Sequence, residues 1–403
     1  MSPSTRASRP SATGWRRVLV VLVALLAVAT PSASAAPAGL GAMPPLVWRL
    51  STSSPAPLVG DAASDALYKT CGAPDEGLRS VAMRNAGRLA RGEPTLPSDE
   101  LAFTLRAAGL PYVWPRAWTM RGPDLAPEKV SEELGKFVAK ATTLGVRRCG
   151  VARLVSAEGT KIVSVVTADV LADLERLPTL ARVGEWITLK GKMLVPASDA
   201  KVVLLGPRGQ PRTVLASLSG DDVRATFSVD QPGEWVVQVL ASASTEPRPV
   251  IEAHILAGTA APLRFAETAA PGEEAAAGAA DDKAALLAMI NAARVSEGLK
   301  PLSTDGALDK VALIHSVRMR DLRTVGHELG DGALSDRLTD AGVVFHSRGE
   351  NLAAAATVAR AHRALWLSPS HRANLLDARF KRLGLGLTKS EDGRVWVTEL
   401  FVD

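Results

Sequence analysis

The middle of the chain consists of short apolar runs without helical periodicity. These runs lie between Val183 and Gly258, and turn-forming segments such as Gly206-Pro207 and Gln231-Pro232-Gly233 separate them. Strands that recur every ~10 to 15 residues predict a β-sandwich of the immunoglobulin-like kind over 179–258. The residues before and after this stretch must therefore fold as separate units.

Length and composition are consistent with a multi-domain globular protein. The chain has 403 residues, which at about 100 to 200 residues per domain predicts two to four domains. Hydrophobic residues make up 47% and charged residues 22%, so real cores can form. The formal net charge is +5. Four positive charges come from Arg6, Arg9, Arg16 and Arg17, so the rest of the chain has a net charge of +1. A chain with this charge balance lacks the excess of positive charge that binds nucleic acid, so we expect no nucleic-acid partner.

The first 35 residues have the features of a secretory signal peptide. An Arg-bearing start is followed by an apolar run from Val18 to Ala29 and by Ala33-Ser34-Ala35, a small-residue cleavage site. A run of about 12 apolar residues is too short to cross ~30 Å of hydrocarbon. We therefore expect cleavage after Ala35, export to a secreted, periplasmic or cell-surface location, and no membrane-spanning segment in the mature chain.

Two cysteines occur in the chain, Cys71 and Cys149. Because an exported protein meets an oxidising compartment, we expect them to form one structural disulfide. Two free, buried thiols are the alternative.

Segments rich in Pro, Gly and Ala divide the remainder. They predict linkers at 36–57 and 259–281, an α/β domain at 58–178 and a final domain at 282–403. The second linker has almost no large apolar residue, so we expect it to be unable to offset the cost of ordering. Glu273 or Glu274 should then be the first site of Glu-specific proteolysis.

The last 120 residues combine helical and strand patterns. Apolar residues at helical spacing predict helices at 283–297, 307–322 and 353–367. Ser368 and Pro369 predict the start of a fourth helix, and strands are predicted at 382–389 and 394–402. Five of the six histidines lie in this part of the chain, which makes it the place to look for a site.

Several motifs in this part follow a familiar order. In chain order they are Ile290-Asn291-Ala292-Ala293-Arg294, Gly298-Leu299-Lys300-Pro301-Leu302, His315-Ser316, Gly326-His327, Gly349-Glu350-Asn351-Leu352, Trp366 to Leu376, and Gly384-Leu385-Gly386. With them, 282–403 resembles the CAP superfamily, also called SCP-like, which includes cysteine-rich secretory proteins, antigen 5 and pathogenesis-related proteins, and it is most similar to the bacterial secreted members. The resemblance implies an α-β-α sandwich.

The resemblance also implies a cleft with two histidines and two acidic residues that can bind a divalent cation, often zinc. His327 and His371 match the histidines, and Glu350 matches one acid. Two neutral imidazoles supply nitrogen ligands, and a nearby carboxylate can ligate the ion or orient one imidazole. For the second acid Asp336 ranks first, ahead of its alternatives Glu328, Asp331 and Glu399.

The other histidines and the tryptophans have structural interpretations. His315 lies on the apolar stripe of its helix and is expected to be buried and hydrogen-bonded. His346 and His362 are expected to be exposed, and Trp366 and Trp396 are expected to lie in the core.

Two functions remain open. The resemblance favours a binding module whose cleft takes a lipid, a glycan, a peptide or another small ligand. The alternative is a secreted hydrolase in which a metal-held water, or Glu350 and His371 as a general-base pair, attacks a peptide-like bond. No Gly-x-Ser-x-Gly motif supports nucleophilic catalysis. The oligomeric state is left open.

The first domain can be aligned with the last. Residues 61–169 align with 308–403 at an offset that drifts from 230 to 234, and 61–169 contains no histidine. These residues are therefore a candidate for a degenerate CAP-like copy that has lost the cleft. An unrelated α/β domain is the alternative.

Overall fold

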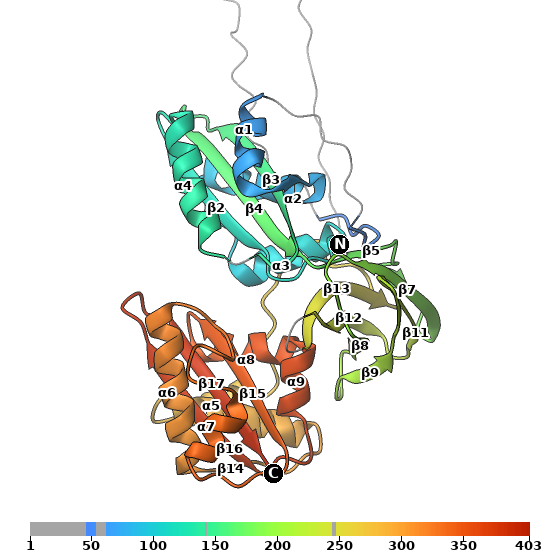
Figure 1. The fold of residues 1–403 in the computed structure, drawn as a ribbon, viewed down its shortest axis with the longest axis vertical. Coiled ribbons are helices and arrows are strands. Elements are labelled where there is room, and N and C mark those ends of the chain that lie inside the picture. Colours follow the sequence, from blue (N-terminus) through green and yellow to red (C-terminus); the bar gives the residue numbers. More distant parts are fainter. Residues whose placement is uncertain (1–45, 54–61, 142, 244–246) are drawn as a thin grey trace, which may run out of the picture. The chain divides into compact units, whose positions relative to one another are not determined.

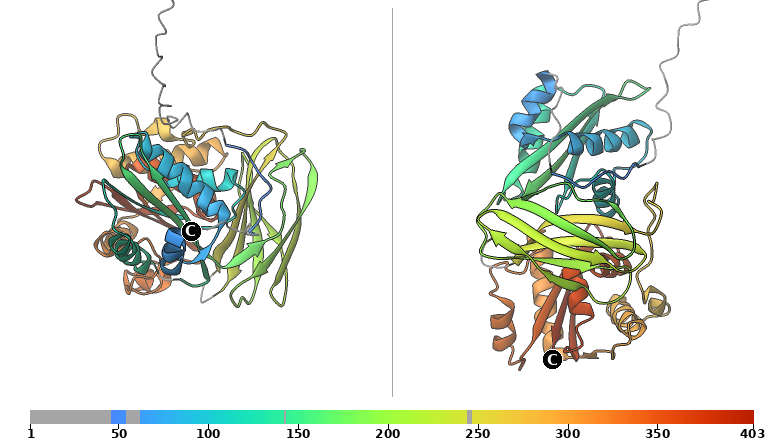
Figure 2. Two further views of the ribbon diagram at one scale, coloured as in Figure 1. Left: turned by 90° about the horizontal axis from the view of Figure 1, so that it is seen from above. Right: turned by 90° about the vertical axis from the view of Figure 1, so that its right-hand side faces the viewer.

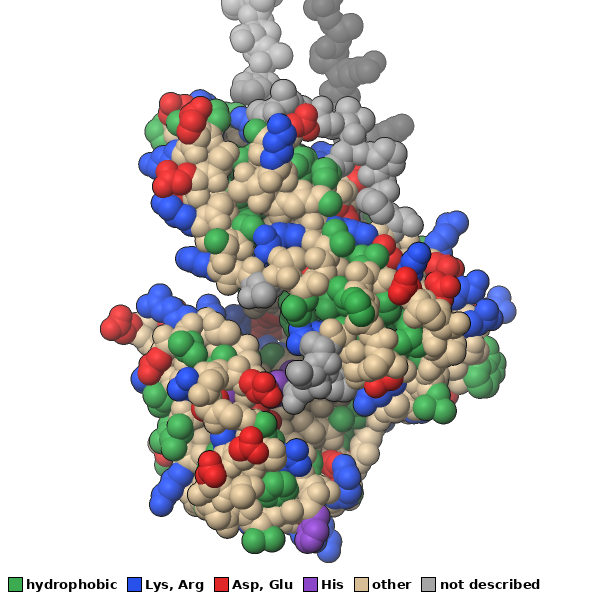
Figure 3. All heavy atoms as spheres, in the orientation of Figure 1, with side chains coloured by type: hydrophobic (Ala, Val, Ile, Leu, Met, Phe, Trp, Pro, Cys, Tyr) green, Lys and Arg blue, Asp and Glu red, His purple; other side chains and the backbone are tan. Residues whose placement is uncertain are grey.

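The computed structural model describes residues 46–53, 62–141, 143–243 and 247–403 (Figures 1 and 2). The predicted signal peptide, its cleavage site and most of the linker at 36–57 lie outside these residues. The described part is a mixed α+β structure with several sheets. None of its helices is long and apolar enough to cross a membrane. On the face drawn in Figure 3, acidic and basic side chains are interspersed.

The first unit is a three-layer α-β-α domain. Its sheet has the order β1-β3-β4-β2, with β1 parallel to β3 and the other pairs antiparallel. Odd-numbered residues of β4 such as Val163 face α1 and α4, whereas even-numbered ones such as Ile162 face α2. Its elements are α1 (Ala62–Cys71), β1 (Ala73–Pro74), α2 (Glu76–Ala90), α3 (Ser98–Ala107), β2 (Arg116–Gly122), α4 (Pro127–Ala139), β3 (Val146–Val155) and β4 (Lys161–Val170).

The predicted disulfide is confirmed. It joins Cys71 at the end of α1 to Cys149 on β3, with 5.9 Å between the two Cα atoms. Both cysteines are fully buried, so the bond ties a helix to the sheet inside the core.

In the part of the middle unit that the structure describes, the regular elements are strands, as the sequence predicts. Two sheets, with the orders β10-β11-β7-β5 and β6-β13-β12-β8-β9, share one hydrophobic core. The strand β5 pairs with β7. The residues of β5, which the sequence analysis places at the end of the first domain, therefore belong to the middle unit. The strands are β5 (Ala172–Leu174), β6 (Leu180–Ala181), β7 (Glu185–Met193), β8 (Ala200–Leu205), β9 (Arg212–Leu215), β10 (Ser217–Ser219), β11 (Asp222–Val229), β12 (Gly233–Ser242) and β13 (Pro247–Ala257).

The last unit is again an α-β-α domain, with the sheet order β14-β16-β17-β15. α6 packs on one face, and α5 and α8 pack on the other. Its elements are α5 (Asp282–Ser296), β14 (Ser303–Thr304), α6 (Gly306–Leu322), α7 (Leu334–Asp340), β15 (Arg348–Ala355), α8 (Val358–Leu367), α9 (Pro369–Leu375), β16 (Arg382–Lys389) and β17 (Val395–Val402).

The prediction of a helix over 353–367 places the start of that helix too early in the chain. Residues up to Ala355 belong to β15, and the helix begins at Val358, where the Thr357 side chain accepts a hydrogen bond from the Arg360 amide. Alanine favours helices, but here pairing with β17 outweighs that propensity.

The expectation for the linker at 259–281 is wrong for its second half. Ala270 is buried in the core that α5 and α8 share, and a short 3₁₀ helix, η1 (Glu273–Ala276), packs on α5. His362, expected to be exposed, is fully buried and its Nε2 lies 3.0 Å from the Pro271 carbonyl oxygen. This segment therefore belongs to the C-terminal domain.

The two α-β-α units have the same topology. In each, a helix, a two-residue strand, two helices, a strand, a further helix and a hairpin follow one another, and the four strands occupy equivalent places in the sheet. Asp75 and Asp305 cap equivalent helices, α2 and α6. Gly150 and Gly384 lie against those helices so closely that a Cβ atom would clash with backbone. Among the described residues of the first unit, no helix corresponds to α9.

Candidate functional site

Three of the four predicted site residues, Glu350, His327 and His371, lie around β15, the edge strand of the C-terminal sheet. Glu350 and Asn351 are neighbours on this strand, so their side chains point to opposite faces of the sheet. His327 comes from the loop between α6 and α7, and His371 comes from α9. The edge position allows groups from both faces to contribute to one site.

Glu350 fixes the orientation of His327. His327 Nδ1 lies 2.7 Å from Glu350 Oε2, and because an ionised carboxylate only accepts hydrogen bonds, Nδ1 donates. The His327 side chain is 51% exposed, whereas that of Glu350 is 3% exposed. The second carboxylate oxygen, Oε1, accepts a hydrogen bond from Arg337 at 2.9 Å, and the same Arg337 nitrogen donates to the His327 carbonyl oxygen at 3.2 Å. Both oxygens of Glu350 are thus engaged.

His371 is neutral and has an unused ring nitrogen. Burial, together with the nearby charge of His327, lowers the pKa of His371 to about 4. Its Nδ1 is buried and has no hydrogen-bond partner among the described residues. A buried polar atom without a partner is costly, so this nitrogen is a candidate for contact with a water or a ligand.

A buried amide network holds α9 against β15. Asn351 Nδ2 donates to the His371 carbonyl oxygen at 3.1 Å and to Glu399 Oε2 at 2.9 Å. Asn374 Nδ2 donates to Asn351 Oδ1 at 2.9 Å and to the Glu350 carbonyl oxygen at 3.2 Å. The network therefore sets where His371 lies relative to Glu350.

Glu399 lies at the inner end of this network. It is fully buried, and its Oε1 has no partner among the described residues. Burial raises the pKa of Glu399 to about 8, although the hydrogen bond from Asn351 acts in the opposite direction. The side chain is therefore mostly protonated at neutral pH.

The structure does not bring the fourth predicted residue to the site. Asp336 is exposed on α7, and its hydrogen bond is to the neighbouring Ser335. Asp331, a lower-ranked alternative, instead bonds His315 Nδ1 at 2.6 Å. Within the described ranges no group of three or more His, Cys, Asp or Glu side chains could hold a metal ion. The donors as arranged thus do not fit the four-residue cation site that the resemblance implies.

The Glu350 and His371 general-base pair is not formed either. Both carboxylate oxygens of Glu350 bond His327 and Arg337, and the buried Nδ1 of His371 has no hydrogen-bond partner among the described residues. Arg337 and Asn374 were missed from the sequence. For Asn374 the signal was available, because it lies in the same motif as His371, three residues further on.

The structural interpretations of the remaining residues are mostly confirmed. His315 is fully buried and bonded to Asp331 and to the Gly326 carbonyl oxygen. The His346 side chain is 89% exposed. Trp366 and Trp396 are buried.

Fold and site together define a small α-β-α domain with a histidine and carboxylate site on its edge strand. Residues 287–401 match the model of the family described as "CAP: Cysteine-rich secretory protein family". The uncharacterized protein YkwD of Bacillus subtilis (strain 168) is 32% identical over 116 residues, which are 28% of this chain and 44% of the relative. The chain thus spans less than half the length of that relative. The C-terminal domain is a CAP domain of the bacterial type.

Two solved structures are also similar to this chain. An outer surface protein from Borrelia burgdorferi has 26% identity and a TM-score of 0.29, over 30% of this chain and 92% of its own. An extracellular protein containing an SCP domain from Bacillus anthracis str. Ames has 18% identity and a TM-score of 0.29, over 57% of this chain and 88% of its own.

Proposed function

We propose that this is an exported protein whose C-terminal CAP domain binds a peptide, a glycan, a lipid or another small ligand at the site of His327 and His371. The observation that carries the proposal is the buried, unpartnered Nδ1 of His371. Beside it, His327 is half exposed and has its ring held in place by Glu350. A fixed pair of imidazoles is a means of recognising a ligand through hydrogen bonds.

A divalent cation such as zinc is a second candidate ligand. A neutral His371 with a free lone pair favours it, and Glu350 would orient His327 as carboxylates orient metal-bound histidines. Two protein donors give weaker binding than the three or four of established zinc sites. We therefore expect zinc to bind more weakly than the organic ligand.

Binding is favoured over hydrolysis. A general base needs a carboxylate or imidazole that can take a proton from water. Both oxygens of Glu350 already accept hydrogen bonds, from His327 and Arg337, so this carboxylate is poorly available as a base.

The finer features of the fold are part of the same proposal. The strand-only middle unit is proposed to be an immunoglobulin-like spacer. The first unit is proposed to be a degenerate CAP copy, supported by the shared topology. By strand register Ala117 on β2 takes the place of Glu350, since Ala117 pairs with Val166 as Glu350 pairs with Leu400. The copy would then have no counterpart of the site at β15.

The test is a ligand screen on the mature full-length protein. Cell-wall glycan fragments, peptides, lipids and zinc would be titrated by calorimetry, and the same compounds would be assayed for turnover. Saturable binding without turnover is the expected result. Turnover of any of them would contradict a pure binding role and favour the hydrolase.

A further inference from the structure

The first domain has a long edge strand, β2. The described sheets end in eight edge strands, and six of these have only two to four residues. The two long ones are β2, with seven residues, and β15, with eight, and they occupy equivalent places in the two α-β-α units. An edge strand carries backbone N–H and C=O groups that no neighbouring strand binds, and natural proteins usually keep such edges short or covered.

Every second residue of β2 directs its backbone groups away from the sheet. The Cys149 carbonyl oxygen on β3 accepts a hydrogen bond from the Asp75 amide next to β1 at 2.8 Å, so the backbone of the following residue, Gly150, faces β4. Gly150 pairs with Val166 of β4, so Val166 is bonded to β3 and not to β2. Ala117 of β2 is opposite Val166 and therefore directs its N–H and C=O outward. The alternation gives the same direction to Thr119 and Arg121.

These outward groups have no partner in the part of the chain that the structure describes. Among the described residues, no hydrogen bond reaches the backbone N–H or C=O of Ala117, Thr119 or Arg121. In the CAP domain the equivalent edge is covered by α9, where Asn374 Nδ2 donates to the Glu350 carbonyl oxygen at 3.2 Å. Five residues of β15 are buried, whereas all residues of β2 are partly or fully exposed. The edge of β2 is thus open.

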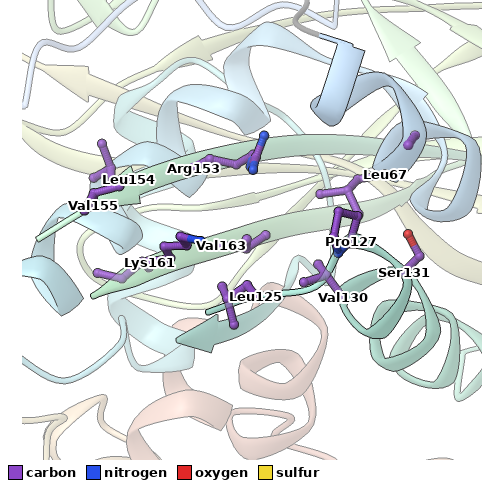
Figure 4. A pocket seen from close by; sticks show the side chains of 12 residues that line it. Leu67, Leu125, Pro127, Val130, Ser131, Arg153, Leu154, Val155, Lys161 and Val163 are labelled. Carbon is purple, nitrogen blue, oxygen red and sulfur yellow. The ribbon is translucent and has the colours of Figure 1, made fainter. Parts of the chain in front are cut away.

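The chain that follows β2 turns onto the face of the sheet and not along its edge. Figure 4 shows Leu125, Pro127 and Val130 near Leu67 of α1 and Val163 of β4. Three of these residues belong to one buried core on that face, and Leu125 packs against it. Helix α4 therefore covers the face of the sheet and leaves the outward groups of β2 accessible.

The two charged residues of β2 are both arginines. Arg116 and Arg121 lie near its two ends, and among the described residues neither forms an ion pair with a carboxylate. Arg116 donates to the Phe137 carbonyl oxygen at 3.4 Å and lies over the Phe137 ring, and Arg121 is exposed. Burial and the nearby charge of Arg147 lower the pKa of Arg116. A second copy of β2 would add two more arginines to this edge, whereas carboxylates would be attracted to it.

We propose that an extended acidic segment of a partner protein docks on β2 as a fifth strand of the sheet. The outward N–H and C=O groups of Ala117, Thr119 and Arg121 bind the backbone of that segment, as in strand addition to other open sheet edges. Its carboxylates pair with Arg116 and Arg121. This surface lies in the first domain and is independent of the ligand proposed for the CAP domain.

The probes are nine-residue peptides with alternating side chains, titrated by calorimetry into the mature full-length protein. Alternating Val and Glu give an acidic strand, and alternating Val and Lys give a basic strand of the same length. The acidic peptide should bind saturably and at least about fivefold more tightly than the basic one. Equal affinities, or no saturable binding of the acidic peptide, would overturn the proposal.

Two N-methylated forms of the acidic peptide test whether its backbone is bound from one side. One form is methylated on the backbone nitrogen of every Val and the other on that of every Glu, which removes those N–H donors. In a strand added to β2, the N–H groups of one set face the edge and those of the other set face solvent. One form should therefore lose at least about tenfold in affinity, the loss of several hydrogen bonds, while the other binds like the parent. Equal losses in both forms would contradict strand addition.

Thr119→Pro tests the edge itself. Proline removes the outward N–H at the centre of β2 and is tolerated on the open side of an edge strand. The variant should retain its circular dichroism spectrum and bind the acidic peptide at least about fivefold more weakly. Thr119→Val keeps the N–H, so it is the matched control and should bind like the wild type. Unchanged binding in Thr119→Pro would place the peptide elsewhere and overturn the proposal.

Two further measurements test the charge and the occupant. Arg121→Gln should lower the affinity for the acidic peptide by about two- to fivefold, whereas Lys129→Gln, which removes an exposed cation on α4, should leave it unchanged. Equal effects of the two variants would contradict the pairing with Arg121. Sedimentation of the wild type should show no dimer that Thr119→Pro dissociates. Such a dimer would assign the edge to a second copy of this chain and overturn the acidic partner.

Discussion

At the scale of single residues, the face of β15 on which a side chain lies decides its role. Glu350 and Asn351 are adjacent, but one meets His327 and Arg337 while the other meets Glu399 and Asn374. Sequence motifs predict Glu350 and both histidines as site residues. They could not identify Arg337, because that contact depends on how α7 lies against β15.

Replacing Glu399 by Gln should stabilise the protein in mildly alkaline solution. The folded-state pKa is raised from 4.5 to about 8, so the folded chain keeps a proton that the unfolded chain releases, and stability falls as the pH rises through that window. Gln removes this loss without changing the size of the side chain. At one pKa unit per ~1.4 kcal/mol, the variant should gain about 4 to 5 kcal/mol near pH 8 and little near pH 4.5.

Urea unfolding at several pH values measures this difference. Glu391→Gln, an exposed change in the β16–β17 turn, is the control and should follow the wild type. A Glu399→Gln variant with the same pH dependence as the wild type would contradict the assignment of Glu399 as a buried neutral acid.

At the scale of elements, the segment before α5 is held by ion pairs. Arg363 on α8 bonds Glu273 through two nitrogens, at 2.8 and 2.7 Å, and it also pairs with Glu267. The composition of this segment concealed its packing, because a single buried alanine, Ala270, and these ion pairs hold it rather than large apolar residues.

Cleavage after Glu273 by a Glu-specific protease should therefore be slow in the wild type. Arg363→Ala should accelerate it several-fold, because the segment must detach to enter the protease and the variant removes its main anchor. Arg360→Ala, which loses a pairing with Glu267 alone, is the matched control and should have a smaller effect. Mass spectrometry of the early fragments measures both rates. Equal cleavage in the two variants would contradict the anchoring role.

The disulfide should be the main covalent stabiliser of the first domain. It closes a sequence separation of 78 residues, for which the chain-entropy model gives about 4 to 5 kcal/mol. The double variant Cys71→Ala and Cys149→Ala should lose most of that free energy of unfolding in denaturant titrations. A loss below about 1 kcal/mol would mean that the α1–α4 core holds the domain without the bond.

At the scale of the whole molecule, elements with a local sequence signal were easier to predict than those that depend on pairing between distant strands. The strands of the middle unit follow from short apolar runs and turns, because that signal is local. β15 was misread in part as helix because Ala353 to Ala355 favour helices and only pairing with β17 makes them a strand. The likeness between the first and last units was visible as an alignment, and the shared sheet order supports it.

We propose that the buried imidazole of His371 is part of a ligand site. The most direct measurement is calorimetric titration of the tightest ligand from the screen into wild type, His371→Ala and His346→Ala. His346 is the control because its side chain is 89% exposed. His371→Ala should lose at least about tenfold in affinity, the loss of one hydrogen bond to a buried group, while His346→Ala should match the wild type. Equal affinity in all three proteins would contradict it.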